Sequence, residues 1–279
     1  MKIYTEFYES DRRVRPGETM GKAELLEVTT SRGRVQGFIL TPNHAEGELH
    51  PAVLMLHGFP GIANNHELGQ SLRKAGFVVF NPFAPGAWGS DGFYSFDGIV
   101  DAAVEIAEFI RSPEVCRQYH IDPEYVYVLG HSMGGFAAVN ATRRLPWTRG
   151  TVLIAPCDIG WYFEHDDMSF PIRFPEIAER ILKTNENLYE NARRIHKDYS
   201  YTAAAEDLKD RNILFIRCAQ DVEIPMDIAT PFFSRMESFG PSCAVRRLII
   251  MDTDHAYNDS KNLMAKTVTD WMAEIADMQ

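Results

Sequence analysis

An apolar, β-branched run ends in a glycine-rich turn in the segment Val126-Tyr127-Val128-Leu129-Gly130-His131-Ser132-Met133-Gly134-Gly135, and helix-forming residues follow to Leu145. This order predicts a strand, a tight turn and a helix, the context in which Gly-x-Ser-x-Gly exposes a serine nucleophile at the top of a sheet. The turn is strained, so we expect Gly130 and Gly134 to let neighbouring backbone approach closely. The motif alone does not separate a catalytic Ser132 from a serine in an ordinary strand-to-helix turn.

Apolar runs alternate with helical patterns on both sides of this turn. Strands are expected at 51–56, 77–80, 125–129, 151–154, 213–216 and 244–250, after an antiparallel hairpin of residues 23–30 and 34–41. Helices are expected at 65–75, 97–111, 136–145, 226–239 and 260–276. This alternation predicts an α/β fold with a mostly parallel sheet and helices on both faces. Ligands bind such sheets beyond the carboxyl ends of the strands.

Residues 158–209 interrupt the alternation, because no strand pattern is evident in them and a charged helical pattern covers 175–196. The segment is too short for a large core of its own. We therefore predict a small helical lid inserted into a core of residues 1–157 and 210–279. Its early aromatic residues either line an apolar substrate pocket or anchor the lid to the core. These residues are Trp161, Tyr162, Phe163, Phe170 and Phe174, and Trp88 is a further pocket candidate.

A serine hydroxyl needs a base that removes its proton, and that base needs a carboxylate that orients it. His255 is the best placed of nine histidines, because it directly follows the last expected strand. Asp221 follows the strand before it, in an Asp-x-x-Ile-Pro segment in which Pro225 is expected to begin a helix. The order serine, aspartate, histidine is the one expected for a nucleophile elbow. The competing carboxylates are Glu223, Asp227, Asp252 and Asp254.

Acyl transfer also needs two N–H donors for the oxyanion. The amide of Met133, at the start of a helix, is one candidate. The amide of Phe59, in the loop His57-Gly58-Phe59-Pro60-Gly61 after an early strand, is the other. His57 follows the wrong strand to serve as the base, and we interpret it as a structural histidine that bonds the loop backbone.

These segments resemble the α/β-hydrolase superfamily over nearly the whole chain. The matching motifs are His57 to Gly61, Gly130 to Gly135, Asp221 to Pro225 and Asp254-His255. The segment Gly89-Ser90-Asp91-Gly92, the insertion and the segment from Asp254 to Asp259 look like those of small bacterial esterases, the feruloyl and cinnamoyl esterases being nearest. The resemblance implies ester hydrolysis through an acyl-enzyme, on small or aromatic acyl groups, with the insertion as a lid. Arg217-Cys218-Ala219 departs from the family, where a His-Gly pair is frequent.

Two other functions stay open at this point. A peptidase or amidase similar to prolyl oligopeptidases would use the same residues, although such enzymes often carry a large extra domain. A catalytically silent scaffold that serves as a binding protein would keep the fold without the reaction.

The composition restricts the partners and the location. A formal net charge of -11 without a basic cluster disfavours nucleic acid. No secretory signal or membrane-length apolar run is evident, and the four cysteines are widely separated, so we expect a cytoplasmic protein with reduced thiols. A small-molecule ester is the expected partner, and the sequence allows a homodimer. No cofactor and no metal are expected, because the segment His165-Asp166-Asp167 lacks a second ligand cluster.

Overall fold

An eight-stranded sheet forms the centre of the computed structural model, which describes residues 2–7, 10–62, 64–165 and 180–278. Its strands are β2 (Ala23–Thr30), β3 (Gly33–Leu40), β5 (His50–Leu56), β6 (Val78–Pro82), β7 (Ile121–His131), β8 (Gly150–Ile154), β9 (Ile213–Cys218) and β10 (Arg246–Met251). The order across the sheet is β10-β9-β8-β7-β5-β6-β3-β2. All neighbours from β10 to β6 are parallel, and β3 and β2 are antiparallel. The predicted α/β class and mostly parallel sheet are confirmed.

The hairpin of β2 and β3 also agrees with its prediction, with Thr30 opposite Gly33 at the turn. The central strands are the continuous apolar runs of the sequence, and they are covered on both faces. Val53, Leu54 and Val128, for example, are fully buried. Such runs are expected where helices cover both sides of a parallel sheet.

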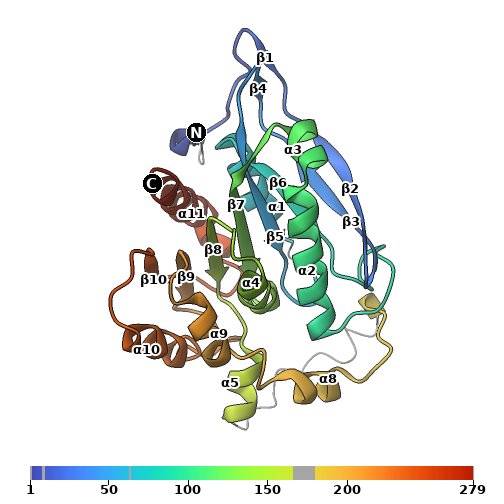
Figure 1. Ribbon diagram of the computed structural model, residues 1–279, viewed down its shortest axis with the longest axis vertical. Helices are drawn as coiled ribbons and strands as arrows, with labels where there is room; N and C mark the ends of the chain where they lie inside the picture. Colours follow the sequence, from blue (N-terminus) through green and yellow to red (C-terminus); the bar gives the residue numbers. More distant parts are fainter. Residues whose placement is uncertain (1, 8–9, 63, 166–179, 279) are drawn as a thin grey trace.

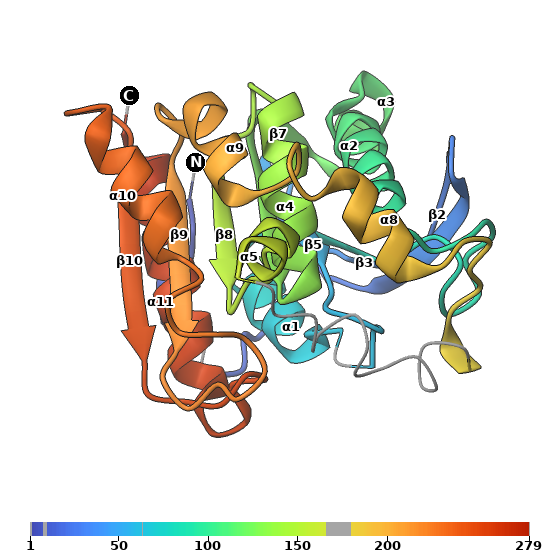
Figure 2. The same cartoon turned by 90° about the horizontal axis from the view of Figure 1, so that it is seen from below.

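Helices cover the two faces of the sheet unequally. The helices outside the insertion are α1 (His66–Lys74), α2 (Phe96–Arg111), α3 (Pro113–Tyr119), α4 (Met133–Arg144), α10 (Thr230–Ser238) and α11 (Lys261–Ala276). Helices α2, α4 and α10 lie on one face, and α1 and α11 lie on the other (Figure 2). Among the described residues, no helix combines the length and the apolarity that crossing a membrane would need.

The insertion contributes three described helices, α5 (Ile159–Glu164), α8 (Leu188–Ile195) and α9 (Tyr201–Leu208). Helix α9 packs against α10 and α4 and so belongs to the layer on the α4 face. Phe170, Phe174 and much of the expected helix 175–196 fall on residues 166–179, outside the described ranges. The division into a core and a lid stays a prediction.

Some boundaries differ from the sequence analysis. The expected helix at 226–239 begins at Thr230, because residues 225–229 form turns in which Ile228 N–H bonds the Pro225 carbonyl. Pro225 therefore begins a turn, and Pro231 is the proline in the first turn of the helix. Helix α3, which the sequence analysis missed, starts at its N-cap Ser112, whose side chain accepts from Val115 N–H.

A second, small sheet lies at the opposite end of the molecule from α5 (Figure 1). It pairs β1 (Glu18–Thr19) with β4 (His44–Ala45), and two short 3-10 helices, Thr5–Phe7 and Asn258–Ser260, complete the described elements. This sheet stands beside the amino-terminal ends of β5 and β7, whereas Ser132 follows the carboxyl end of β7.

Candidate active site

Ser132 occupies a sharp turn between β7 and α4, with φ 54° and ψ -121°. A positive φ is rare for a residue with a side chain, and it persists only where the surroundings hold it. Here the Ser132 N–H donates to the Ile154 carbonyl at 2.9 Å, and the Ser132 carbonyl accepts from the N–H groups of Gly135 at 2.8 Å and Cys157 at 2.9 Å. Strand β8 and the residues after it therefore fix the turn.

Close backbone approach around this turn explains its glycines. A Cβ on Gly134 would lie 2.0 Å from the Leu56 carbonyl oxygen, and one on Gly130 would lie 2.1 Å from the Gly134 oxygen. Neither position accepts a side chain without displacing backbone. The prediction for these two glycines is confirmed.

The loop after β5 passes directly beside the Ser132 side chain. A Cβ on Gly58 would lie 3.0 Å from Ser132 Cβ and 3.5 Å from Ser132 Oγ. Phe59 follows in the same loop, and Met133 is the first residue of α4, whose first-turn N–H groups have no partner within the helix. Both expected amides thus lie on segments adjoining the hydroxyl, and their role as oxyanion donors stays a prediction.

His255 and Asp221 form a half-buried, hydrogen-bonded pair. His255 Nδ1–H donates to Asp221 Oδ2 at 2.7 Å, and the two side chains are 13% and 3% exposed. The other oxygen, Oδ1, accepts from the backbone N–H groups of Glu223 at 2.8 Å and Ile224 at 3.0 Å. Burial raises the pKa of Asp221, but the hydrogen bonds from His255 and the two amides outweigh it and leave the pKa below its ordinary value. The imidazole therefore keeps Nε2 as its free acceptor.

His131, the residue before Ser132, holds the His255 backbone. His131 Nε2–H donates to the His255 carbonyl at 2.8 Å, and the two ring centroids are 4.9 Å apart. Burial first, and then the neighbouring His255, lower the pKa of His131 to about 3, so the ring is neutral. The sequence analysis missed this residue. Its position in the motif was visible, but its partner is 124 residues away.

The free nitrogen of His255 faces a second carboxylate. His255 Nε2 lies 4.0 Å from Glu223 Oε2, and the Glu223 side chain is 46% exposed. Within the described residues no hydrogen bond joins Ser132 Oγ to His255, although His131 ties the segments that carry them. Serine and base are often poorly aligned without substrate.

The competing carboxylates near His255 in sequence have other partners. Asp252 accepts from the Gln220 side chain at 2.8 Å, and Asp254 accepts from the backbone and side-chain nitrogens of Asn258, each at 2.7 Å. These two carboxylates therefore stabilise the loop after β10 and do not orient the His255 imidazole.

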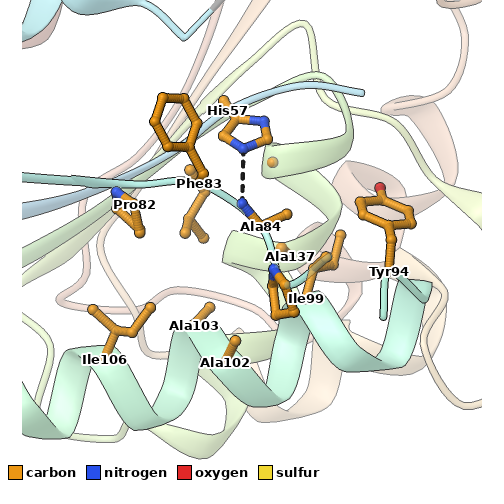
Figure 3. A pocket seen from close by; sticks show the side chains of 13 residues that line it. His57, Pro82, Phe83, Ala84, Tyr94, Ile99, Ala102, Ala103, Ile106 and Ala137 are labelled. Carbon is orange, nitrogen blue, oxygen red and sulfur yellow. Dashed lines mark hydrogen bonds between the residues drawn. The ribbon is translucent and has the colours of Figure 1, made fainter. Parts of the chain in front are cut away.

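His57 bonds only backbone, as the sequence analysis expected. Its Nε2 accepts from the Ala84 N–H at 3.0 Å (Figure 3). Nδ1 therefore carries the proton and donates to the Gly58 carbonyl at 2.7 Å. Burial lowers its pKa and keeps the ring neutral. Below it lies a cavity of about 30 Å³ between the β5 loop and α2. Apolar side chains line this cavity, among them Phe83, Tyr94, Ile99, Ala103 and Ile106.

Of the six aromatic residues predicted as pocket candidates, the four that lie in the described ranges, Trp88, Trp161, Tyr162 and Phe163, do not line this cavity. Trp161 and Tyr162 are buried in one hydrophobic cluster with Phe136 of α4, so α5 packs against the layer that contains α4. Phe163 stacks on His196 with centroids 4.4 Å apart. Trp88 is 44% exposed, and its Nε1–H donates to the Pro60 carbonyl at 3.0 Å. Their contact with substrate stays a prediction.

Comparisons with known proteins agree with this fold. The model of a family described as "Alpha/beta hydrolase family" matches residues 53–278. No match was found among curated proteins. Among solved structures, the alpha/beta hydrolase GrgF from Penicillium sp. sh18 is similar with a TM-score of 0.69 and 13% identity, over 91% of this chain and 98% of that one.

Two further solved structures share the fold. The esterase Pf2001 from Pyrococcus furiosus has a TM-score of 0.64 and 14% identity, over 91% of each chain. The acylaminoacyl peptidase from Pyrococcus horikoshii has a TM-score of 0.63 and 14% identity, over 92% of this chain and 42% of that one.

Proposed function

We propose that this chain, which belongs to the alpha/beta hydrolase family, hydrolyses carboxylic esters through an acyl-enzyme on Ser132. One observation carries the proposal. The half-buried His255–Asp221 pair is tied by a hydrogen bond to His131, the residue next to the strained Ser132. A fold that only needed a turn here would not require a half-buried, oriented imidazole beside it.

Each residue has a defined part in the proposed reaction. Ser132 Oγ forms a bond to the acyl carbon while its proton passes to His255 Nε2. Asp221 stabilises the imidazolium through Nδ1–H. The N–H groups of Met133 and Phe59 bind the oxyanion. When the intermediate collapses, the alcohol leaves with the proton from Nε2, and a water molecule then repeats both steps on the acyl-enzyme.

We assign small or aromatic acyl groups to the substrate. The support is the contact between the aromatic helix α5 and the Asp221 loop, where the Tyr162 hydroxyl donates to the Glu223 carbonyl at 3.4 Å. Aromatic side chains suit an acyl or aryl group better than a charged one. We propose residues 158–209 as the lid over this group.

The test measures turnover of p-nitrophenyl acetate by the wild type and by Ser132→Ala. We expect the variant to lose activity by at least about 10⁴-fold, because no other group supplies the nucleophile. Its melting temperature is expected to stay close to that of the wild type. Ser238→Ala, which removes an exposed hydroxyl at the end of α10, is the matched control and keeps the wild-type rate. Wild-type turnover by Ser132→Ala would refute the proposal.

Two further measurements separate the remaining alternatives. Rates on acetyl, butyryl, octanoyl and feruloyl esters are compared with rates on an aminoacyl anilide, and faster anilide cleavage would indicate a peptidase or amidase. A fluorophosphonate probe should label Ser132. A folded wild type that neither labels nor turns over any ester would be a binding scaffold.

A further inference from the structure

A cluster of metal-ligating side chains lies at the end of the sheet away from Ser132. His44 belongs to β4, His50 is the first residue of β5, and Glu48 lies in the turn between them. The potential ligand atoms of the three side chains all lie within 4.8 Å of one another. Two of the three are histidines, so the cluster is more than a group of surface acids.

The His50 imidazole is arranged as a ligating histidine usually is. His50 Nδ1–H donates to the Gly76 carbonyl at 3.1 Å, which leaves Nε2 with a lone pair directed at His44 Nδ1, 3.0 Å away. A ligating histidine almost always donates its other N–H to a backbone carbonyl or carboxylate, which fixes its tautomer and orientation.

Glu48 is oriented by two hydrogen bonds. Its Oε1 accepts from the Tyr4 hydroxyl at 3.1 Å, and its Oε2 accepts from the Ala45 N–H at 3.1 Å. Each carboxylate oxygen retains a further lone pair. The carboxylate is therefore positioned beside the imidazoles without being saturated.

The two histidines of the cluster, His44 and His50, help to line a cavity of about 250 Å³, together with His120. The His120 ring stacks on His44 with centroids 3.9 Å apart, so it supports the His44 ring from one side. The cavity is large enough to admit a hydrated ion and to keep water at an open coordination position.

We propose that His44, Glu48 and His50 bind one divalent transition-metal ion, with zinc as the best fit. Two imidazole nitrogens and one carboxylate oxygen are a common zinc ligand set, and water completes four-coordination. Bonds of about 2.0–2.2 Å place tetrahedral ligands about 3.3 Å apart, close to the 3.0 Å between the two nitrogens. The carboxylate closes the remaining distance by side-chain rotation.

The bound ion would join β4 to the start of β5, and hence the small sheet to the central one. His50 N–H also bonds the His120 carbonyl at 2.8 Å, so the link extends to the residue before β7. The site stands apart from Ser132 and serves stability instead of the reaction. Its sequence signature is His-x-x-x-Glu-x-His, which the sequence analysis did not consider.

The test uses the full chain without a histidine tag. Protein treated with a chelator is dialysed against zinc, and bound metal is measured by elemental analysis for the wild type, Glu48→Gln, His44→Gln and the control His66→Gln. His66 is a partly exposed histidine of α1 outside the cluster. We expect one zinc per chain in the wild type and the control, and a loss of affinity of at least about 10-fold in each cluster variant. Cobalt(II) should give the visible absorption of a tetrahedral site.

Zinc at 100 times its Kd should also raise the melting temperature of the wild type and the control by about 5 °C, and that of Glu48→Gln by much less. Glu48→Gln keeps the side-chain shape, so this variant still tests the site if His44→Gln does not fold. Equal zinc binding by wild type and Glu48→Gln, or none by the wild type, would overturn the proposal. His44 Nδ1 and His50 Nε2 would then be joined only by an N–H···N hydrogen bond.

Discussion

At the scale of single residues, the His255 imidazole is positioned by groups other than Ser132. Asp221 accepts a hydrogen bond from His255 Nδ1–H, and His131 donates one to the His255 backbone carbonyl. The Glu223 carboxylate lies 4.0 Å from His255 Nε2. The base is therefore oriented before substrate arrives, by contacts that do not include Ser132. Preorganisation of this kind lowers the cost of reaching the transition state.

Asp221→Asn should place the wrong tautomer in the site. The amide oxygen would remain with the N–H groups of Glu223 and Ile224, which donate to Asp221 Oδ1, so the NH₂ group would face His255 Nδ1. That nitrogen would then accept, and Nε2 would carry a proton and no longer act as base. We expect kcat to fall about 10⁴-fold. Asp252→Asn, whose carboxylate bonds only Gln220 among the described residues, should keep its rate. Comparable kcat values for the two variants would contradict this account.

His131 is a positioning residue, and a pair of variants isolates its hydrogen bond. His131→Leu loses the donor to the His255 carbonyl, whereas His131→Gln can supply one from its amide. We expect kcat to fall about 10-fold or more in the leucine variant, with KM little changed, because a small displacement of the base affects the reaction more than binding. The glutamine variant should recover part of the rate. If both variants lose kcat equally, His131 acts through packing and not through this bond.

At the scale of elements, Asp158 joins the insertion to the core. It follows β8, its Oδ1 accepts from Gly160 N–H at 2.9 Å in α5, and its Oδ2 accepts from Tyr201 N–H at 3.1 Å at the start of α9. Burial raises the pKa of Asp158 to about 7, and these backbone hydrogen bonds only partly oppose that effect. One carboxyl thus links two helices to the strand whose end fixes Ser132.

This carboxyl should make stability depend on pH. Between the ordinary aspartate value near 3.9 and about 7, the folded chain holds a proton that the unfolded chain has lost, so the stabilising contribution falls as pH rises. Asp158→Asn does not titrate and is less stable at pH 5, because its NH₂ group must face one of the two N–H donors. We expect the stability difference between wild type and variant to shrink from pH 5 to pH 8, measured as urea midpoints. A constant difference would refute the raised pKa.

Elements were predictable from the sequence to the extent that local pattern determines them. The continuous apolar runs gave the central strands, and the glycines around Ser132 gave the turn, because only glycine tolerates that approach. Helix α9 was not anticipated, since its buried face is defined by packing against α4 and α10. Pro225 was misread as a helix start, because a proline favours a turn equally well.

The residues of the candidate site also fall into two groups, those that a local motif predicts and those that only the folded chain reveals. Ser132, Asp221 and His255 were expected from motif order, and the structure brings the last two within 2.7 Å. His131 and Glu223 owe their place beside His255 to contacts across the fold, which no local pattern encodes. The cluster of His44, Glu48 and His50 is local in sequence, but its meaning depends on the Gly76 carbonyl that orients His50.

At the scale of the whole molecule, buried neutral histidines are distributed across the central sheet. His131 stands after the carboxyl end of β7 with a pKa of about 3, and His50 stands at the start of β5 with a pKa of about 4, both lowered chiefly by burial. Burial also lowers the pKa of His57. In the unfolded chain all three titrate near 6.5. Stability at both ends of the sheet is therefore linked to pH.

Whether the free energy of unfolding rises or falls with pH depends on how many protons the chain takes up when it unfolds. A histidine with a depressed folded pKa stabilises fully above about 6.5, and this contribution is lost as pH falls toward the folded value. Below pH 6, unfolding protonates His131 and His50 and releases one proton from Asp158, a net uptake of about one proton, to which the lowered pKa values of His57 and His44 add. We expect the free energy of unfolding to fall by at least about 1 kcal/mol from pH 7 to pH 5, measured by urea denaturation with a chelator present. His50→Gln, which removes one of these histidines, should show a shallower fall. A wild type equally stable at pH 5 and pH 7 would mean that these imidazoles are protonated in the folded chain.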